Sequence, residues 1–277
     1  VMIKKYCRRI ALAILLFGVP YAASELVVAE RTFRIRMIPE ALKMTLMGHT
    51  WSHMWYLYLI LFLYLITPLL KKVLRVLPVW GVAAVMAVIF LGSSVAPFLN
   101  KVLDVNSIPV LPDGGVYFLY YLCGYLFAVR EVGVDKGRNV WLTAAVAVLA
   151  LGMILSRTLA GFSIQMAYNY PFTVLLAVLL FAAGWNGSIQ KHRIPWQEAG
   201  ALSFAVYLVH PVYVNLLYKF VKITPFTVLE QCGVQSVAAG QAVLILLLAA
   251  FCLVVLALAT ATAWVLRKIP VLRKFVL

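Results

Sequence analysis

The chain has 277 residues, of which 65% are hydrophobic and only 12% charged, and its mean hydropathy is +0.99. Soluble domains are about 45–50% apolar and about 25% charged, so this composition excludes a soluble enzyme, a disordered chain and a secreted disulfide scaffold. The net charge of +15 comes from 24 Lys and Arg residues against 9 Asp and Glu residues. The basic residues form short clusters between long apolar runs, which indicates membrane lipid as the partner and not nucleic acid.

Apolar runs long enough to cross a bilayer recur along the whole chain, since a helical span takes about 20 mostly apolar residues. In chain order they are residues 10–29, 53–70, 79–99, 115–129, 139–156, 170–186, 201–218 and 240–266. The connections between them are short and polar, so we expect one membrane-embedded domain over residues 1–277 and no soluble domain. The predicted fold class is all-α, a polytopic bundle with about eight transmembrane helices present.

The distribution of Lys and Arg between the predicted loops indicates the orientation of the bundle. With residues 1–9 in the cytoplasm, sixteen of the 24 basic residues lie on the cytoplasmic side. We therefore expect a multi-pass protein of the cell (inner) membrane with both termini of this chain cytoplasmic. The loop 30–52 is an exception, because it would place basic residues outside the cytoplasm. It could be an anion site, an amphipathic surface helix or a mere departure from the rule. The helical spacing of Arg31, Arg34 and Met37 favours the helix.

The cysteines and histidines do not have the spacing of a metal site. Four cysteines are present, but none of them forms a CxxC pair. His49 and His53 are four residues apart and would share one face of a helix, but this stretch lacks the carboxylate that usually completes such a zinc site. We therefore expect no bound metal.

Three ionisable residues within or beside the apolar runs are candidates for function, because such groups are costly in a membrane. Glu25 either reaches the membrane interface, pairs with a nearby arginine, or serves a site. His53 lies either in an aromatic belt at the membrane border or in a functional cavity. His210 is either a packing and hydrogen-bonding group or a site residue, and the following Pro211 frees the carbonyl four residues before it from its helical hydrogen bond.

Four segments, in this order, resemble the acyltransferase-three family of integral membrane O-acyltransferases. The basic segment 4–10 (KKYCRRI) is similar to the family's R-x-x-R stretch, and residues 48–68 (GHTWSHMWYL to LYLITP) to its H-L-W-[FY]-L block. Residues 117–125 (YFLYYLCGY) resemble its glycine-bearing aromatic helix, and residues 203–211 (SFAVYLVHP) its late Y-L-x-H-P block. The two histidine blocks, at this separation, form the most specific pair.

The resemblance implies an enzyme, an acyltransferase that transfers groups other than aminoacyl groups. It would move an acyl group, expected to be acetyl, from acyl-CoA as donor substrate to a hydroxyl of a cell-envelope sugar, glycan or lipid-linked sugar (O-acetylation). No permanently bound cofactor is expected. The implied donor-binding residues are Lys5, Arg8 and Arg9, because cationic side chains suit the phosphates of coenzyme A. The alternative is that this cluster only sets the orientation of the first helix. The expected cavity and acceptor residues are Glu25, His53, Trp55, Tyr56 and His210.

The family pattern also includes two earlier helices, with a basic residue and the histidine that is its expected catalytic base. Nothing before Lys4 supplies them, so we expect a chain that lacks the first two of ten helices and is inactive alone. His53 is then the only catalytic candidate, and the oligomeric state stays open. A secondary transporter or a non-catalytic membrane scaffold remains the alternative, although the sequence has no inverted repeat typical of transporters.

Overall fold

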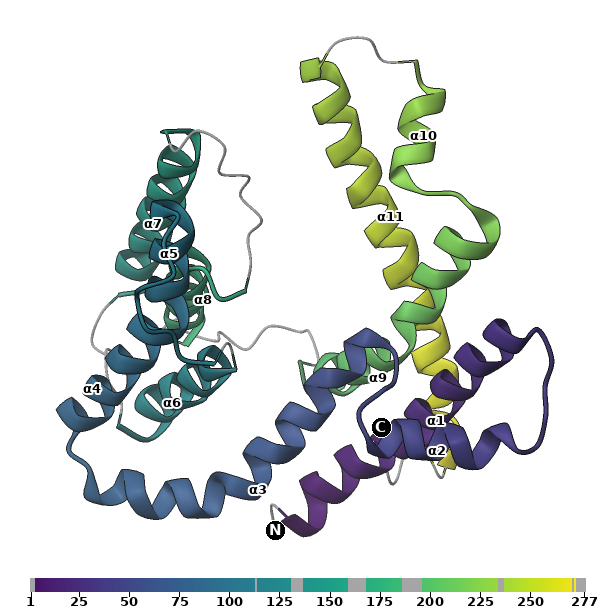
Figure 1. Cartoon of the computed structure of the whole chain (residues 1–277), viewed down its shortest axis with the longest axis horizontal. Coiled ribbons are helices and arrows are strands. Elements are labelled where there is room, and N and C mark those ends of the chain that lie inside the picture. Colours follow the sequence, from purple (N-terminus) through teal and green to yellow (C-terminus); the bar gives the residue numbers. More distant parts are fainter. Residues whose placement is uncertain are drawn as a thin grey trace. The chain divides into compact units, whose positions relative to one another are not determined.

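The computed structural model describes residues 3–112, 114–130, 137–158, 168–185, 196–233, 237–270 and 272, and every regular element in these ranges is a helix. The all-α class predicted from the sequence is therefore confirmed (Figure 1). The chain divides into two compact units, which are described one at a time: unit 1 is Val1–Pro68 with Arg193–Leu277, and unit 2 is Leu69–His192.

Unit 1 combines the two ends of the chain. Its helices are η1 (Ile3–Cys7, a π-helical turn), α1 (Arg8–Glu30), α2 (Met37–Leu46), η2 (Ser52–Met54), α9 (Trp196–Asn215), η4 (Leu216–Val221, π-helical), α10 (Pro225–Gln231) and α11 (Val237–Leu266). The helix α3 (Trp55–Val76) begins in unit 1 and ends in unit 2. Unit 2 continues with α4 (Val79–Phe90), η3 (Leu91–Val95, π-helical), α5 (Ala96–Leu103), α6 (Gly115–Arg130), α7 (Arg138–Thr158) and α8 (Pro171–Trp185).

The helices have the length and composition of membrane spans. Among the described residues, five helical stretches are long and apolar enough to cross a bilayer: Lys5–Glu30, Ser52–Val76, Val79–Leu103, Leu202–Gln231 and Ala239–Leu266. Three shorter apolar helices are Gly115–Val129, Asn139–Ile154 and Pro171–Trp185. Each of the eight apolar runs predicted from the sequence corresponds to one of these helices. The chain is an integral membrane protein, and its many exposed Leu, Ile and Val side chains suit contact with lipid.

The core of unit 1 lies where α1, the start of α3, α9 and α11 meet. Small residues allow this close packing, since Ala13 of α1, Ala205 of α9 and Ala259 of α11 are fully buried. Hydrogen bonds from tyrosines add to it: the Tyr21 hydroxyl donates to the backbone oxygen of Leu208 at 2.5 Å. Small residues and interhelical hydrogen bonds are what hold helices together in lipid, where apolar burial gives little driving force.

The loop between α1 and α3 contains the predicted surface helix, in a shifted position. Arg31 ends α1 with a φ of 54°, and the helix α2 begins only at Met37. Arg34 therefore lies outside a helix, where its guanidinium pairs with the Glu30 carboxylate at 3.5 Å. The helix α2 packs on α1 so closely that a Cβ on Gly18 would lie 2.7 Å from Cγ2 of the buried Thr45.

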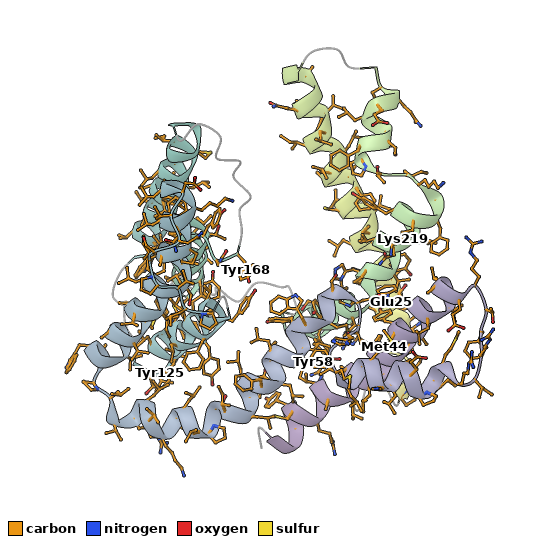
Figure 2. All side chains as sticks on the ribbon, viewed as in Figure 1. Glu25, Met44, Tyr58, Tyr125, Tyr168 and Lys219 are labelled. Atoms are coloured by element: carbon orange, nitrogen blue, oxygen red, sulfur yellow. The ribbon has the colours of Figure 1, made fainter. Side chains whose placement is uncertain are left out.

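Unit 2 is organised around a π-helical turn in a long apolar helix. This turn, η3, carries two fully buried serines, and the Ser94 hydroxyl donates to the backbone oxygen of Asn169 at 2.6 Å. A Cβ on Gly115 would lie 2.4 Å from the Ser93 hydroxyl, so the start of α6 approaches η3 very closely. The Tyr125 hydroxyl of α6 (labelled in Figure 2) donates to the backbone oxygen of Leu74 in α3 at 3.2 Å.

Candidate active site

Two cavities of unit 1 are lined by residues of α1 and α9, one together with η2 and η4 and the other together with α3. The histidine cavity, of about 620 Å³, is lined by Glu25, Thr50, Trp51, Ser52, His53, His210, Pro211, Val214, Asn215 and Lys219. The arginine cavity, of about 570 Å³, is lined by Tyr6, Arg9, Ile10, Tyr56, Ile60, Tyr64, Gly200, Ser203, Phe204 and Tyr207. Both volumes are in the range of about 300–1,000 Å³ that is usual for sites of small molecules.

The histidine cavity brings together two histidines that are far apart in the sequence. The ring centroids of His53 and His210 lie 5.8 Å apart, with a T-shaped arrangement. Tyr21 supports them, since its ring lies 5.5 Å from that of His53 and stacks on Trp51 at 4.3 Å. The Nε2 atom of His53 is buried and has no hydrogen-bond partner among the described residues. A buried polar atom without a partner costs about 1–3 kcal/mol, so this position favours a polar group of a ligand.

His210 is positioned by the proline that follows it. Residue 211 in a regular helix would donate its N–H to the oxygen of residue 207, but Pro211 has no N–H. The Nδ1 atom of His210 instead lies 2.9 Å from the Tyr207 oxygen, and 3.3 Å from the Val206 oxygen. The sequence predicted the freed carbonyl, and the structure shows that the histidine side chain is its partner.

Two further polar residues of the histidine cavity were not predicted from the sequence. Asn215 ends α9, and its side-chain amide donates to the Pro211 oxygen at 2.9 Å. Lys219 lies one turn later in η4, and it lines the cavity together with Glu25 of α1 (Figure 2). The available signal was their spacing, because Pro211, Asn215 and Lys219 follow one another at intervals of four residues and so share one helix face.

Among the residues that the structure describes, the arginine cavity has aromatic walls and one basic residue, Arg9. The Arg9 guanidinium lies 5.3 Å from the ring centroid of Phe204, a cation–π contact. The Ser203 hydroxyl donates to the Gly200 oxygen at 2.8 Å. Of the predicted donor-binding residues, Arg9 lines this cavity, whereas Lys5 and Arg8 are exposed and line neither cavity.

The remaining predicted acceptor residues are divided between the two cavities. Glu25, His53 and His210 line the histidine cavity, and Tyr56 lines the arginine cavity. Trp55 lines neither of them, and 47% of its surface is exposed.

The two cavities share two helices, α1 and α9. On α1, Arg9 belongs to one cavity and Glu25 to the other, and sixteen residues of helix correspond to about 24 Å, close to the thickness of a bilayer core. Tyr207 of α9 lies between the cavities. Its hydroxyl donates to the backbone oxygen of His53, and its ring lies 5.7 Å from the His53 ring and 5.8 Å from that of Tyr56.

The fold and the site define the class of this protein: it is a helical membrane protein with polar cavities inside its helix bundle. A family model described as an acyltransferase domain matches residues 1–264 of the chain. The chain therefore belongs to the acyltransferase-three family, and the resemblance seen in the sequence is confirmed. Membership of the family indicates transferase activity and implies an acyl donor. A search of curated proteins and a search of solved structures found no match.

Proposed function

We propose that this protein is an O-acyltransferase that moves an acyl group, most simply acetyl, from acyl-CoA to a hydroxyl of a cell-envelope sugar or glycan. The donor enters the arginine cavity with its anionic end on Arg9, the one of the three predicted donor-binding residues that lines this cavity. The acceptor occupies the histidine cavity. The cytoplasm, where acyl-CoA is available, is then on the side of Arg9, in agreement with the excess of basic residues on that side.

The observation that carries this proposal is the arrangement of the two cavities about Tyr207. An acyl transfer between two substrates needs two binding sites whose reacting atoms meet, and orientation is a large part of the rate enhancement. In unit 1 a cavity with an arginine and a cavity with two histidines adjoin the same tyrosine ring. The family match supplies the class of reaction.

The reaction that these residues serve is attack of a hydroxyl on a thioester. The hydroxyl oxygen bonds to the carbonyl carbon, a base takes the hydroxyl proton, and the C–S bond breaks. The leaving thiolate takes up a proton and departs as coenzyme A, and the product is an ester. Histidine is the side chain most often used for such proton transfer near neutral pH, and His53 is our candidate for contact with the reacting hydroxyl.

The test is an assay of membranes that contain the protein expressed from its complete gene, with radiolabelled acetyl-CoA as donor. Transfer of the label to extracted glycan or lipid-linked sugar, absent from control membranes, is the expected result. Solute uptake driven by protons or sodium, without transfer of the label, would contradict the proposal and indicate a transporter.

A matched pair of histidine variants tests the site in the same assay. His53→Ala should lower acyl transfer at equal abundance in the membrane, because His53 lines the histidine cavity. His49→Ala should leave it unchanged, since His49 is exposed and lines neither cavity. If His53→Ala keeps the same transfer activity as His49→Ala, His53 does not serve the reaction and is an aromatic-belt residue.

A further inference from the structure

The hydrogen bond between His210 and its own helix determines which nitrogen of the ring carries the hydrogen. The Nδ1 atom lies 2.9 Å from the Tyr207 oxygen. A backbone carbonyl oxygen can only accept a hydrogen bond, so Nδ1 must be the donor. In a neutral imidazole the other nitrogen is then an acceptor. The neutral ring is thereby fixed in the Nδ1–H form, with a lone pair on Nε2.

The direction of this lone pair follows from the same contact. The two nitrogens of an imidazole point in diverging directions, so a ring whose Nδ1 faces its own helix directs Nε2 away from that helix. His210 lines the histidine cavity, and no described residue forms a hydrogen bond with its Nε2. The cause lies in the sequence: because Pro211 cannot bond to the Tyr207 oxygen, this oxygen needs another donor.

We infer that the neutral His210 ring presents the lone pair of Nε2 to the histidine cavity and there accepts a hydrogen bond from a second hydroxyl of the acceptor, beside the reacting hydroxyl that contacts His53. The identity of the ligand rests on the proposed function. The position of the hydrogen on the His210 ring does not, because it follows from the contact with the Tyr207 oxygen alone. Pro211 acts through His210 as a positioning residue, since it leaves free the carbonyl that fixes the ring. His210 thus orients the acceptor relative to His53, and a substrate without a hydroxyl at the position of Nε2 gains nothing from this contact.

The state of the ring can be measured without any activity. In protein labelled with ¹⁵N-histidine, at about pH 8, NMR distinguishes protonated from unprotonated ring nitrogens. The His210 signals are identified as those missing from His210→Gln. We expect hydrogen on Nδ1 and none on Nε2, and a larger share of Nε2–H in Pro211→Ala, where residue 211 can again bond to the Tyr207 oxygen. Hydrogen on Nε2 in the unmodified protein would overturn the inference. The same share of Nε2–H in Pro211→Ala as in the unmodified protein would overturn the positioning role of Pro211.

Two substitutions of His210 separate its two hydrogen bonds in the transfer assay. An asparagine amide can replace Nδ1–H as donor to the Tyr207 oxygen but has no atom at the position of Nε2. A glutamine reaches that position and offers an oxygen as acceptor. We expect His210→Asn to raise the KM for the acceptor about tenfold, the order of one lost hydrogen bond, and His210→Gln to raise it less. Equal effects of the two variants, or none, would overturn the contact. If the NMR result holds and no transfer occurs in the unmodified protein, the proposed function fails while the assigned ring state stands.

Discussion

Substitution of Arg9 by glutamine tests whether the arginine cavity holds the anionic end of the donor. Arg8 is the matched control, because Arg8→Gln removes the same charge from the neighbouring position without changing the lining of the cavity. A charge-assisted hydrogen bond to a phosphate contributes about 1.5–3 kcal/mol, which corresponds to about 10- to 150-fold in affinity. Arg9 is half-buried, so solvent screening favours the lower end. We expect Arg9→Gln to raise the donor KM about tenfold.

A shortened donor separates phosphate binding from other effects of the substitution. The contact with Phe204 contributes about 0.5–1 kcal/mol, so Arg9→Gln also weakens the packing of α1 on α9 slightly. An acyl thioester that lacks the nucleotide of coenzyme A carries no phosphate for Arg9 to bind. Its KM should therefore be the same in Arg9→Gln and in the unmodified protein. The reasoning is refuted if both donors are affected equally, or if Arg8→Gln raises the KM as much as Arg9→Gln.

Three further expectations concern stability and topology. Gly18→Ala should lower the free energy of unfolding in detergent by about 1–3 kcal/mol, since the new Cβ would meet Thr45, and unchanged thermal stability would contradict the close packing of α2 on α1. Tyr207→Phe, which loses only the hydroxyl bonded to the His53 oxygen in η2, should cost about 0.5–1.5 kcal/mol by the same measurement, and a more stable variant would contradict that bond. A reporter fused after Leu277 should be active in the cytoplasm and one inserted between α10 and α11 outside it, and the reverse pattern would refute the orientation.

The helices were predictable from the sequence because a bilayer imposes their length and composition. The contact of His53 with His210 was only partly predictable: both were assigned to one cavity, but their contact depends on how η2 packs on α9. A helix that is apolar all round gives no periodic signal of which side faces the protein. For this reason both Arg8 and Arg9 were predicted to bind the donor, although of the two only Arg9 lines a cavity.

The polar residues at the end of α9 were missed for a different physical reason. Asn215 and Lys219 lie near the end of an apolar run. Polar residues are common there, at the membrane surface, so their presence does not indicate a functional site. Asn215 ends α9, and Lys219 lies in the π-helical turn η4, which the sequence does not predict. Such turns inside α-helices are frequent at functional sites, because they change which residues face inward.

The tyrosine hydrogen bonds between helices have a consequence for how this protein tolerates mutation. Tyr21 and Tyr207 both donate to backbone oxygens, and an oxygen of the main chain is present whatever side chain its residue carries. Each contact is therefore vulnerable on one side only: loss of the tyrosine breaks it, whereas a change at Leu208 or His53 leaves the acceptor in place. Selection can then alter the chemistry at His53 while the hydrogen bond that joins α9 to η2 persists.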